Sequence, residues 1–413
     1  MFMEDYSRPK LIRITTVPVS LKTLLKGQLR FMHENAFEVV GVSSPGIELQ
    51  EAAQNEGVRV VPVEMTRTIS PLKDLKSVWK LFFFFRREKP QIVHTHTPKA
   101  GIAGMLAARL AGVPHRLHTV AGLPLLEAKG IKRVLLNVVE KATYACATRV
   151  YPNSYGLFNI IIQNRYTRAE KLKVIGNGSS NGIDTTRFCA AHFSEAYCQQ
   201  LRHSLQIQPD DFVFIFVGRM VGDKGINELV GAFSKMTGQG KSGSGDPHIP
   251  GGESVTLKSG VKLLLIGNFE RDLDPLLPDT EREINTNPDI IFAGYQSDVR
   301  PFFAISDCLV FPSYREGFPN VVMQAGAMEL PAIVSNINGC NEIVEEGKNG
   351  MIVEPKDQEA LQSAMKYVLE HRVDYDKLKQ HARDMITSRY EQSVIWAALL
   401  EEYRNLLVQN TGS

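Results

Sequence analysis

The chain has 413 residues, more than one ordinary hydrophobic core accommodates, so we expect two domains of similar size. Its 47 basic and 45 acidic residues nearly balance, which argues against nucleic acid as a partner, because nucleic-acid-binding domains are usually plainly basic. Hydrophobic residues make up 43% and charged residues 22%, as in folded globular proteins, and this excludes a disordered or fibrous chain.

The cysteines and the N-terminal segment indicate the cellular compartment. Five cysteines are scattered along the chain without a C-x-x-C pair, which predicts free thiols in a reducing compartment rather than disulfides or a zinc site. Residues 1–17 are charged and lack the hydrophobic region of a signal peptide. No stretch of about 18 uncharged apolar residues occurs, so we expect no membrane-spanning helix and a cytoplasmic location.

Short apolar segments alternate with helical stretches along the first half. We expect buried strands at 11–17, 38–44, 58–63, 91–97, 116–120 and 149–154. We expect helices between them, including 21–34, 72–89 and 99–111. This alternation predicts an α/β domain with a doubly wound parallel sheet.

The second half repeats this plan. We expect strands at 212–218, 262–267, 290–295, 308–313, 332–336 and 351–355. We expect helices at 227–236, 320–330, 357–371, 374–389 and 392–409, with Asp357 and Asp374 as N-caps. A second α/β domain therefore follows the first.

Glycine-rich segments mark the domain organisation. The joint is expected within 175–188, which gives a first domain 1–180, joined by the final helix 392–413, and a second domain 181–391. Residues 237–254 are rich in Gly, Ser and Pro without an apolar period. They predict a surface loop inserted in the second domain.

Two cations follow the first predicted strand of the second domain. That strand ends at Gly218, Arg219 and Lys224 lie in the loop, and Gly225 precedes a helix. Cations beside free amides at a helix start suit a diphosphate. The alternative is that both side chains are solvated loop charges.

A second polar group lies within 311–336. Glu316 follows a predicted strand, Pro319 suits the first turn of the next helix, and Gln324 lies on that helix. A loop carboxylate and a helix side chain can bind vicinal hydroxyls of a sugar or ribose. The alternative is a carboxylate stabilised by the helix dipole.

Polar residues also follow strands of the first domain. His118 lies near a strand end, and the alternative for it is a core histidine. Lys99, at a strand-to-helix junction, is a candidate for binding an acceptor phosphate. His94 and His96 are expected on opposite faces of their strand, and without further ligands we expect no metal site. No G-x-G-x-x-G follows the first strand, so no dinucleotide cofactor is expected.

Both motifs of the second domain resemble family-4 retaining glycosyltransferases, which have the GT-B fold of two Rossmann-like domains facing a cleft. That family shows G-R-x(n)-K-G and then E-x7-E. Here Gly218-Arg219 with Lys224-Gly225 match the first pattern, and Glu316 with Gln324 match the second, where a second Glu is usual. The similarity covers nearly the whole chain and is greatest to bacterial capsule, O-antigen and glycan-assembly transferases.

The resemblance implies a reaction. A hexose or N-acetylhexosamine would pass with retention from a nucleotide-sugar, with uridine as the expected nucleoside, to a glycan or a polyprenyl-diphosphate-linked sugar. No metal or other cofactor is expected, since the nucleotide-sugar is a substrate. Two alternatives stay open: a sugar-nucleotide-binding subunit without transfer activity, which the departure at Gln324 motivates, and a GT-B nucleotide-sugar epimerase.

The resemblance also implies roles for the matching residues. Arg219 and Lys224 would hold the donor diphosphate and offset the charge of the leaving group, and the amides of Phe318 and Asn320 would add contacts. The remaining assignments concern the sugar and the ribose: Glu316 and His118 would lie at the donor sugar, and Gln324 would face the ribose.

Two segments of the first half join apolar and basic residues. Residues 77–89 contain five consecutive large apolar residues beside Arg86, Arg87 and Lys89, and residues 129–141 have a similar mixture. Such segments can lie on an anionic bilayer, which would place the protein peripherally at the inner face of the membrane. The alternative is that the apolar residues face the core.

Overall fold

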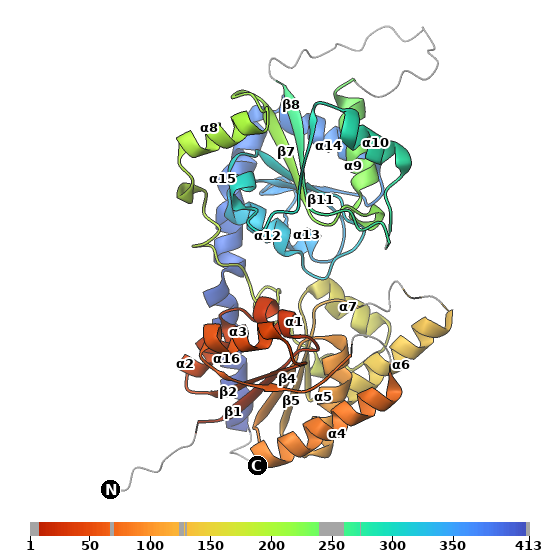
Figure 1. The fold of residues 1–413 in the computed structure, drawn as a ribbon, viewed down its shortest axis with the longest axis vertical. Coiled ribbons are helices and arrows are strands. Elements are labelled where there is room, and N and C mark those ends of the chain that lie inside the picture. The colour runs from red at the N-terminus through yellow and green to blue at the C-terminus, as the bar shows by residue number, and fades with distance from the viewer. Residues whose placement is uncertain are drawn as a thin grey trace. The chain divides into compact units, whose positions relative to one another are not determined.

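The computed structural model describes residues 8–66, 70–123, 128, 130–238, 260–272 and 274–409. Contacts divide the chain into unit 1, Met1–Gly182 with Gln392–Ser413, and unit 2, Ile183–Glu391 (Figure 1). Of the loop expected at 237–254, all but the first two residues lie outside the described ranges.

Unit 1 is built on a parallel sheet in the order β3-β2-β1-β4-β5-β6. Its strands are β1 Lys10–Ile14, β2 Glu38–Ser43, β3 Arg59–Pro62, β4 Ile92–Thr95, β5 His115–Val120 and β6 Arg149–Pro152. The six strands expected here are present. Five are largely buried apolar runs, whereas β3, at the edge of the sheet, is only partly buried. The direction of the strand order changes between β1 and β4.

Helices cover both faces of this sheet (Figure 1). They are α1 Pro18–Leu24, α2 Gln28–Glu34, α3 Ile47–Glu56, α4 Pro71–Glu88, α5 Pro98–Leu110, α6 Gly130–Cys146, α7 Tyr155–Gln163 and α16 Gln392–Gln409. The single helix expected at 21–34 is two helices, because Gly27 breaks it with φ +78°. A Cβ at Gly27 would lie 2.5 Å from the Trp396 ring of α16, so the break also makes room for the last helix.

Unit 2 repeats the plan in the order β12-β11-β10-β7-β8-β9. Its strands are β7 Phe212–Val217, β8 Val261–Ile266, β9 Ile290–Gly294, β10 Cys308–Phe311, β11 Ala332–Ser335 and β12 Gly350–Val353. All neighbouring pairs are parallel. The expected α/β, doubly wound fold is confirmed for both units, and the strand order of unit 2 changes direction between β7 and β10.

The helices of unit 2 lie on both sides of its sheet (Figure 1). They are α8 Glu195–Ser204, α9 Ile226–Met236, α10 Pro278–Thr286, α11 Arg300–Ala304, α12 Asn320–Ala327, α13 Cys340–Ile343, α14 Gln358–Glu370 and α15 Arg372–Tyr390. Asp357 caps α14 as expected, accepting from the Ala360 amide at 2.8 Å. Asp374 does not cap α15: the helix begins two residues earlier, and the Asp374 carboxylate accepts from the Tyr367 hydroxyl instead.

Candidate functional site

The loops that follow β7 and β10 lie at the point where the strand order of unit 2 changes direction. In doubly wound sheets, the crevice beyond the carboxyl ends of the strands at this point is where ligands bind. Arg219 and Lys224 follow β7, and Glu316 follows β10. The sheet topology therefore brings both sequence motifs to one edge of unit 2.

Lys224 and Glu316 form an ion pair. Lys224 Nζ donates to Glu316 Oε1, and both side chains are mostly buried, at 13% and 18% exposed. Glu316 Oε1 also accepts from the Ser313 hydroxyl at 3.1 Å, and Lys224 Nζ lies 5.9 Å from the centre of the Phe311 ring. The two residues, 92 positions apart in the chain, thus form one charged group.

Gly225 holds Lys224 in place by a close backbone approach. Lys224 ends the short 3-10 helix Gly222–Lys224, and Gly225 follows it with φ +71°. A Cβ at Gly225 would lie 2.2 Å from the Pro312 carbonyl oxygen. Only glycine fits there, which explains why a glycine follows the lysine between loop and helix.

Arg219 is more exposed than Lys224. Its side chain is 45% exposed and its Nη1 lies 3.0 Å from Glu270 Oε2. Exposed pairs of this kind contribute about 0–1 kcal/mol, so an incoming anion can replace the carboxylate at little cost. Both cations that the sequence singled out therefore have carboxylate partners, one exposed and one mostly buried.

Helix α12 begins directly after this loop. Pro319 is its N-cap, one position before the first turn, and no side chain caps the helix start. Phe318 is buried with its ring 5.3 Å from that of Tyr390, Asn320 is exposed, and Gln324 is half-buried one turn further on. The first amides of α12 are therefore not bonded by a capping side chain.

Sequence reasoning missed two residues that hold the 316–318 loop. Asn338 Nδ2 donates to the carbonyl oxygens of Glu316 and Gly317, at 3.0 and 2.6 Å. Gly339 has φ +79°, and a Cβ there would lie 2.6 Å from the Gly317 carbonyl oxygen. The Asn-Gly pair after a predicted strand was the signal, since it marks a tight turn.

His118 lies in the core of unit 1. It is 3% exposed, and its Nδ1 is 2.8 Å from the Thr95 hydroxyl. A Cβ at Gly101 would lie 2.6 Å from its Cε1, and burial lowers the pKa of His118 to about 4. This placement agrees with the core alternative, while a role of His118 in the reaction stays a prediction.

Lys99 also has a carboxylate partner, Asp74 of α4, at the start of α5. His94 and His96 were expected on opposite faces of their strand, and this was wrong. Residues two positions apart share a face, and the two rings lie 4.2 Å apart, centre to centre. Within the part of the chain that the structure describes, no group of three His, Cys, Asp or Glu side chains could hold a metal ion.

Similarity to solved structures identifies the fold as GT-B. The fold is similar to a glycosyltransferase of Rickettsia africae, with a TM-score of 0.77 at 18% identity, covering 97% of this chain and 99% of that one. It is also similar to Anabaena HepE in complex with UDP-glucose, with a TM-score of 0.74 at 18% identity, covering 96% and 100%.

The sequence places the chain in a family. Residues 199–385 match the family described as Glycosyl transferases group 1, and residues 26–178 match the Glycosyl transferase 4-like domain. The chain is 32% identical to the capsular polysaccharide biosynthesis glycosyltransferase CapM of Staphylococcus aureus, over 98% of this chain and 99% of that protein. The protein therefore belongs to the group 1 glycosyltransferases, and the resemblance seen in the sequence is confirmed.

A second relative carries a more specific name. The chain is 30% identical to the UDP-Gal:alpha-D-GlcNAc-diphosphoundecaprenol alpha-1,3-galactosyltransferase of Escherichia coli, over 75% of this chain and 74% of that protein.

Among the described helices, none has the length and apolar character needed to cross a bilayer.

Proposed function

We propose that the chain transfers a hexose or N-acetylhexosamine from a UDP-sugar to a glycan or polyprenyl-diphosphate-linked sugar, with retention of configuration. The observation that carries the donor part is the Lys224–Glu316 pair with Arg219 at the carboxyl edge of unit 2. The names of two similar proteins support the substrate classes: HepE was solved with UDP-glucose, and the Escherichia coli relative is named for a diphosphoundecaprenol acceptor. Retention rests on the family resemblance.

The charges of this site suit departure of a diphosphate. The bond between the anomeric carbon and the diphosphate oxygen breaks, and its electron pair remains on the diphosphate. Arg219, Lys224 and the amides of Phe318 and Asn320 stabilise that charge without a metal. The acceptor oxygen bonds to the anomeric carbon on the same face, and its proton passes to a leaving phosphate oxygen.

Other residues place the donor. Glu316, bonded to Lys224 and Ser313, keeps one carboxylate oxygen for a sugar hydroxyl, while Gln324 faces the ribose. An amide offers an acceptor and a donor where a carboxylate offers two acceptors, so ribose binding is weaker here than with Glu. For His118 we propose that it orders the strand end after Thr95, because its ring is buried.

Replacing the two cations tests the donor site. Losing a hydrogen bond to a charged group costs about 1.5–3 kcal/mol, so Arg219→Ala and Lys224→Ala should each lower transfer about 10- to 150-fold and weaken UDP-sugar binding. Arg271→Ala is the matched control: Arg271 is exposed and paired with Glu281 of the same unit. Near-normal transfer in both site variants would refute the donor part. Product analysis without acceptor detects an epimerase, and activity gained only in Gln324→Glu would indicate a non-catalytic subunit.

We further propose that unit 1 touches an anionic membrane surface through α4 and α6. Helix α5 contacts both, so they lie on the same side of the sheet (Figure 1). Their outward-facing apolar side chains are Leu72, Leu75, Trp79, Phe83, Ile131, Val134, Leu135 and Val138, each between 42% and 89% exposed. The basic residues of these helices flank them, as in helices that lie in a bilayer interface.

The apolar residues of α4 therefore contribute to two surfaces, the core of unit 1 and the exposed face of the helix. Leu81, Phe84 and Phe85 are buried in the core, whereas Trp79 and Phe83 are exposed. Lys129, part of the second segment considered above, lies outside the described residues.

Sedimentation with vesicles tests the membrane contact. We expect binding to phosphatidylglycerol vesicles, weakened by salt and reduced about tenfold by Trp79→Ser, because one apolar side chain loses its burial. Leu277→Ser is the control, since Leu277 is exposed on unit 2. Equal binding of both variants, or none by the wild type, would contradict the proposal.

A further inference from the structure

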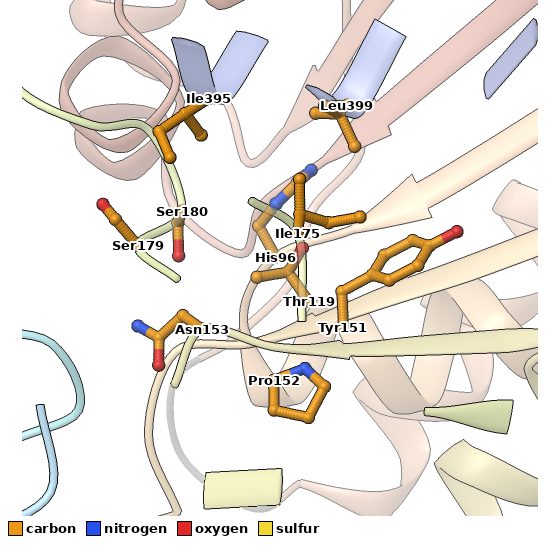
Figure 2. Close-up of a pocket in the computed structure, with 10 residues that line it drawn as sticks. All are labelled: His96, Thr119, Tyr151, Pro152, Asn153, Ile175, Ser179, Ser180, Ile395 and Leu399. Atoms are coloured by element: carbon orange, nitrogen blue, oxygen red, sulfur yellow. The ribbon is translucent and has the colours of Figure 1, made fainter. Parts of the chain in front are cut away.

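Unit 1 contains a small cavity beyond the carboxyl ends of β4, β5 and β6, and none of the proposed donor residues lines it. Its volume is about 20 Å³, room for roughly one water-sized group. In Figure 2, Ser180 and Asn153 lie on one side of this space, and His96 and Thr119 lie on the other. Apolar residues of α16 complete the wall.

Three residues of this wall carry a buried polar atom without a hydrogen-bond partner among the described residues: His96 Nδ1, Asn153 Oδ1 and Ser180 Oγ. His96 and Asn153 are only 5% and 6% exposed. A buried polar atom left unpaired costs about 1–3 kcal/mol, so three around one cavity indicate a polar group that the chain itself does not supply.

The other hydrogen bonds of these residues determine whether each unpaired atom is a donor or an acceptor. Arg13 Nε donates to His96 Nε2 at 2.8 Å, and an arginine can only donate. The neutral His96 ring therefore carries its proton on Nδ1, which makes this atom a donor. Asn153 Nδ2 donates weakly to the Ala121 carbonyl at 3.4 Å, so Oδ1 is an acceptor, and the Ser180 hydroxyl can do either.

This combination of a donor, an acceptor and a hydroxyl that can do either suits the binding of a hydroxyl group. A hydroxyl accepts from His96 and from Ser180 and donates to Asn153, whereas a phosphate oxygen only accepts and would leave the Asn153 oxygen unpaired. The volume admits one such group and not a sugar ring. Burial also lowers the pKa of His96 well below its usual value, with the charge of Arg13 adding to the effect, so the ring stays neutral.

The wall is held in place by bonds from distant elements. Gln28 Nε2 donates to the Ser180 carbonyl at 3.2 Å, and the Ser179 amide donates to the Asn153 carbonyl at 2.7 Å. Trp396 Nε1 donates to Asn181 Oδ1 at 2.7 Å. A site ordered in this way loses little conformational entropy when a ligand binds.

We propose that this cavity binds one hydroxyl of the acceptor sugar, which accepts from His96 Nδ1 and from the Ser180 hydroxyl and donates to Asn153 Oδ1. The inference rests on the proposed function, because it presumes a sugar acceptor. The rest of the sugar lies outside the cavity. Binding of this one hydroxyl therefore determines the orientation of the acceptor sugar.

Binding of a defined probe, N-acetylglucosamine linked by a diphosphate to a short polyprenyl chain, tests the proposal by calorimetry. Ser180→Ala removes an oxygen that has no hydrogen-bond partner among the described residues, so the fold should persist, and probe affinity should fall about fivefold, the effect of one hydrogen bond. Ser180→Val also fills the cavity and should weaken binding further. Ser335→Ala, which removes an equally unpaired buried oxygen from unit 2, should leave probe affinity unchanged.

Monodeoxy forms of the probe, each lacking one hydroxyl of the sugar, identify the hydroxyl that the cavity binds. The form that lacks it should bind wild type and Ser180→Ala equally well. Unchanged affinity in both Ser180 variants, with a probe that the wild type binds, would overturn the inference and leave a water-filled cavity, while the proposed function would stand. A wild type that neither binds the probe nor glycosylates any lipid-linked sugar would overturn the acceptor class and this inference together.

Discussion

Acid should destabilise unit 1 more than unit 2, because four histidines are buried in the described part of unit 1: His94, His96, His115 and His118. Burial lowers the pKa of His118 to about 4 and the pKa values of His94 and His96 well below the usual range, with the charge of Arg13 contributing to the latter two. At a pH between the pKa of a buried histidine in the folded state and its pKa in the unfolded chain, the histidine takes up a proton when the protein unfolds. The stability that these groups provide is therefore complete above about pH 6.5 and is lost as the pH falls toward 4.

The magnitude follows from the pKa of His118. Lowering the pH from about 7.5 to 5 should remove about 2 kcal/mol of unfolding free energy through His118 alone. His94, His96 and His115, whose pKa values burial also lowers, act in the same direction. Glu140, whose pKa burial raises, offsets a part, because it takes up its proton more readily in the folded state.

Hydrogen exchange measured by mass spectrometry resolves the two units. Amides of unit 1 should lose protection at pH 5 relative to pH 7.5, after correction for the intrinsic exchange rate. Unit 2 is the internal control, since the histidines of its described part are all exposed: His192, His203, His371 and His381. Equal losses in both units would contradict the reasoning.

His118→Asn isolates one residue. Its amide oxygen can still accept from the Thr95 hydroxyl, but the side chain no longer titrates. The substitution should reduce the stability difference between the two pH values by about 2 kcal/mol, whatever its effect at neutral pH. An unchanged pH dependence in urea unfolding would refute the assignment.

Three further predictions concern the donor site. Gly225→Ala should lower the melting temperature and weaken UDP-sugar binding, because its Cβ would meet the Pro312 carbonyl and positive φ costs about 1–3 kcal/mol; a calorimetric scan and a UDP titration measure this. Gln324→Glu should tighten UDP binding several-fold through charge-assisted bonds to the ribose, and no change in the titration would remove Gln324 from the ribose site. A chelator such as EDTA should leave the transfer rate unchanged in a radiolabel assay, and a loss restored by a divalent cation would require a metal in the mechanism.

The fold could be predicted because it depends on patterns within short segments. Buried parallel strands are continuous apolar runs, so β7 and β8 are visible as Phe212–Val217 and Val261–Ile266 without knowledge of their neighbours. The donor motifs were visible for a related reason: Lys224-Gly225 and Glu316 follow strands, and strand ends carry ligand-binding residues in this architecture. Helix limits were less certain, as Gly27 and Asp374 show, because packing decides where a helix starts and stops.

What the sequence by itself determined is therefore the α/β class, the repeat of the sheet and the edge at which the charged residues gather. Only the tertiary structure decided which side chains meet. It paired Lys224 with Glu316, buried His118 beneath α5, and assembled one cavity from His96, Asn153, Ser180 and α16. The physical reason is that periodicity records burial along the chain, whereas contacts between distant residues depend on strand order and on the packing of helices from the far end of the sequence.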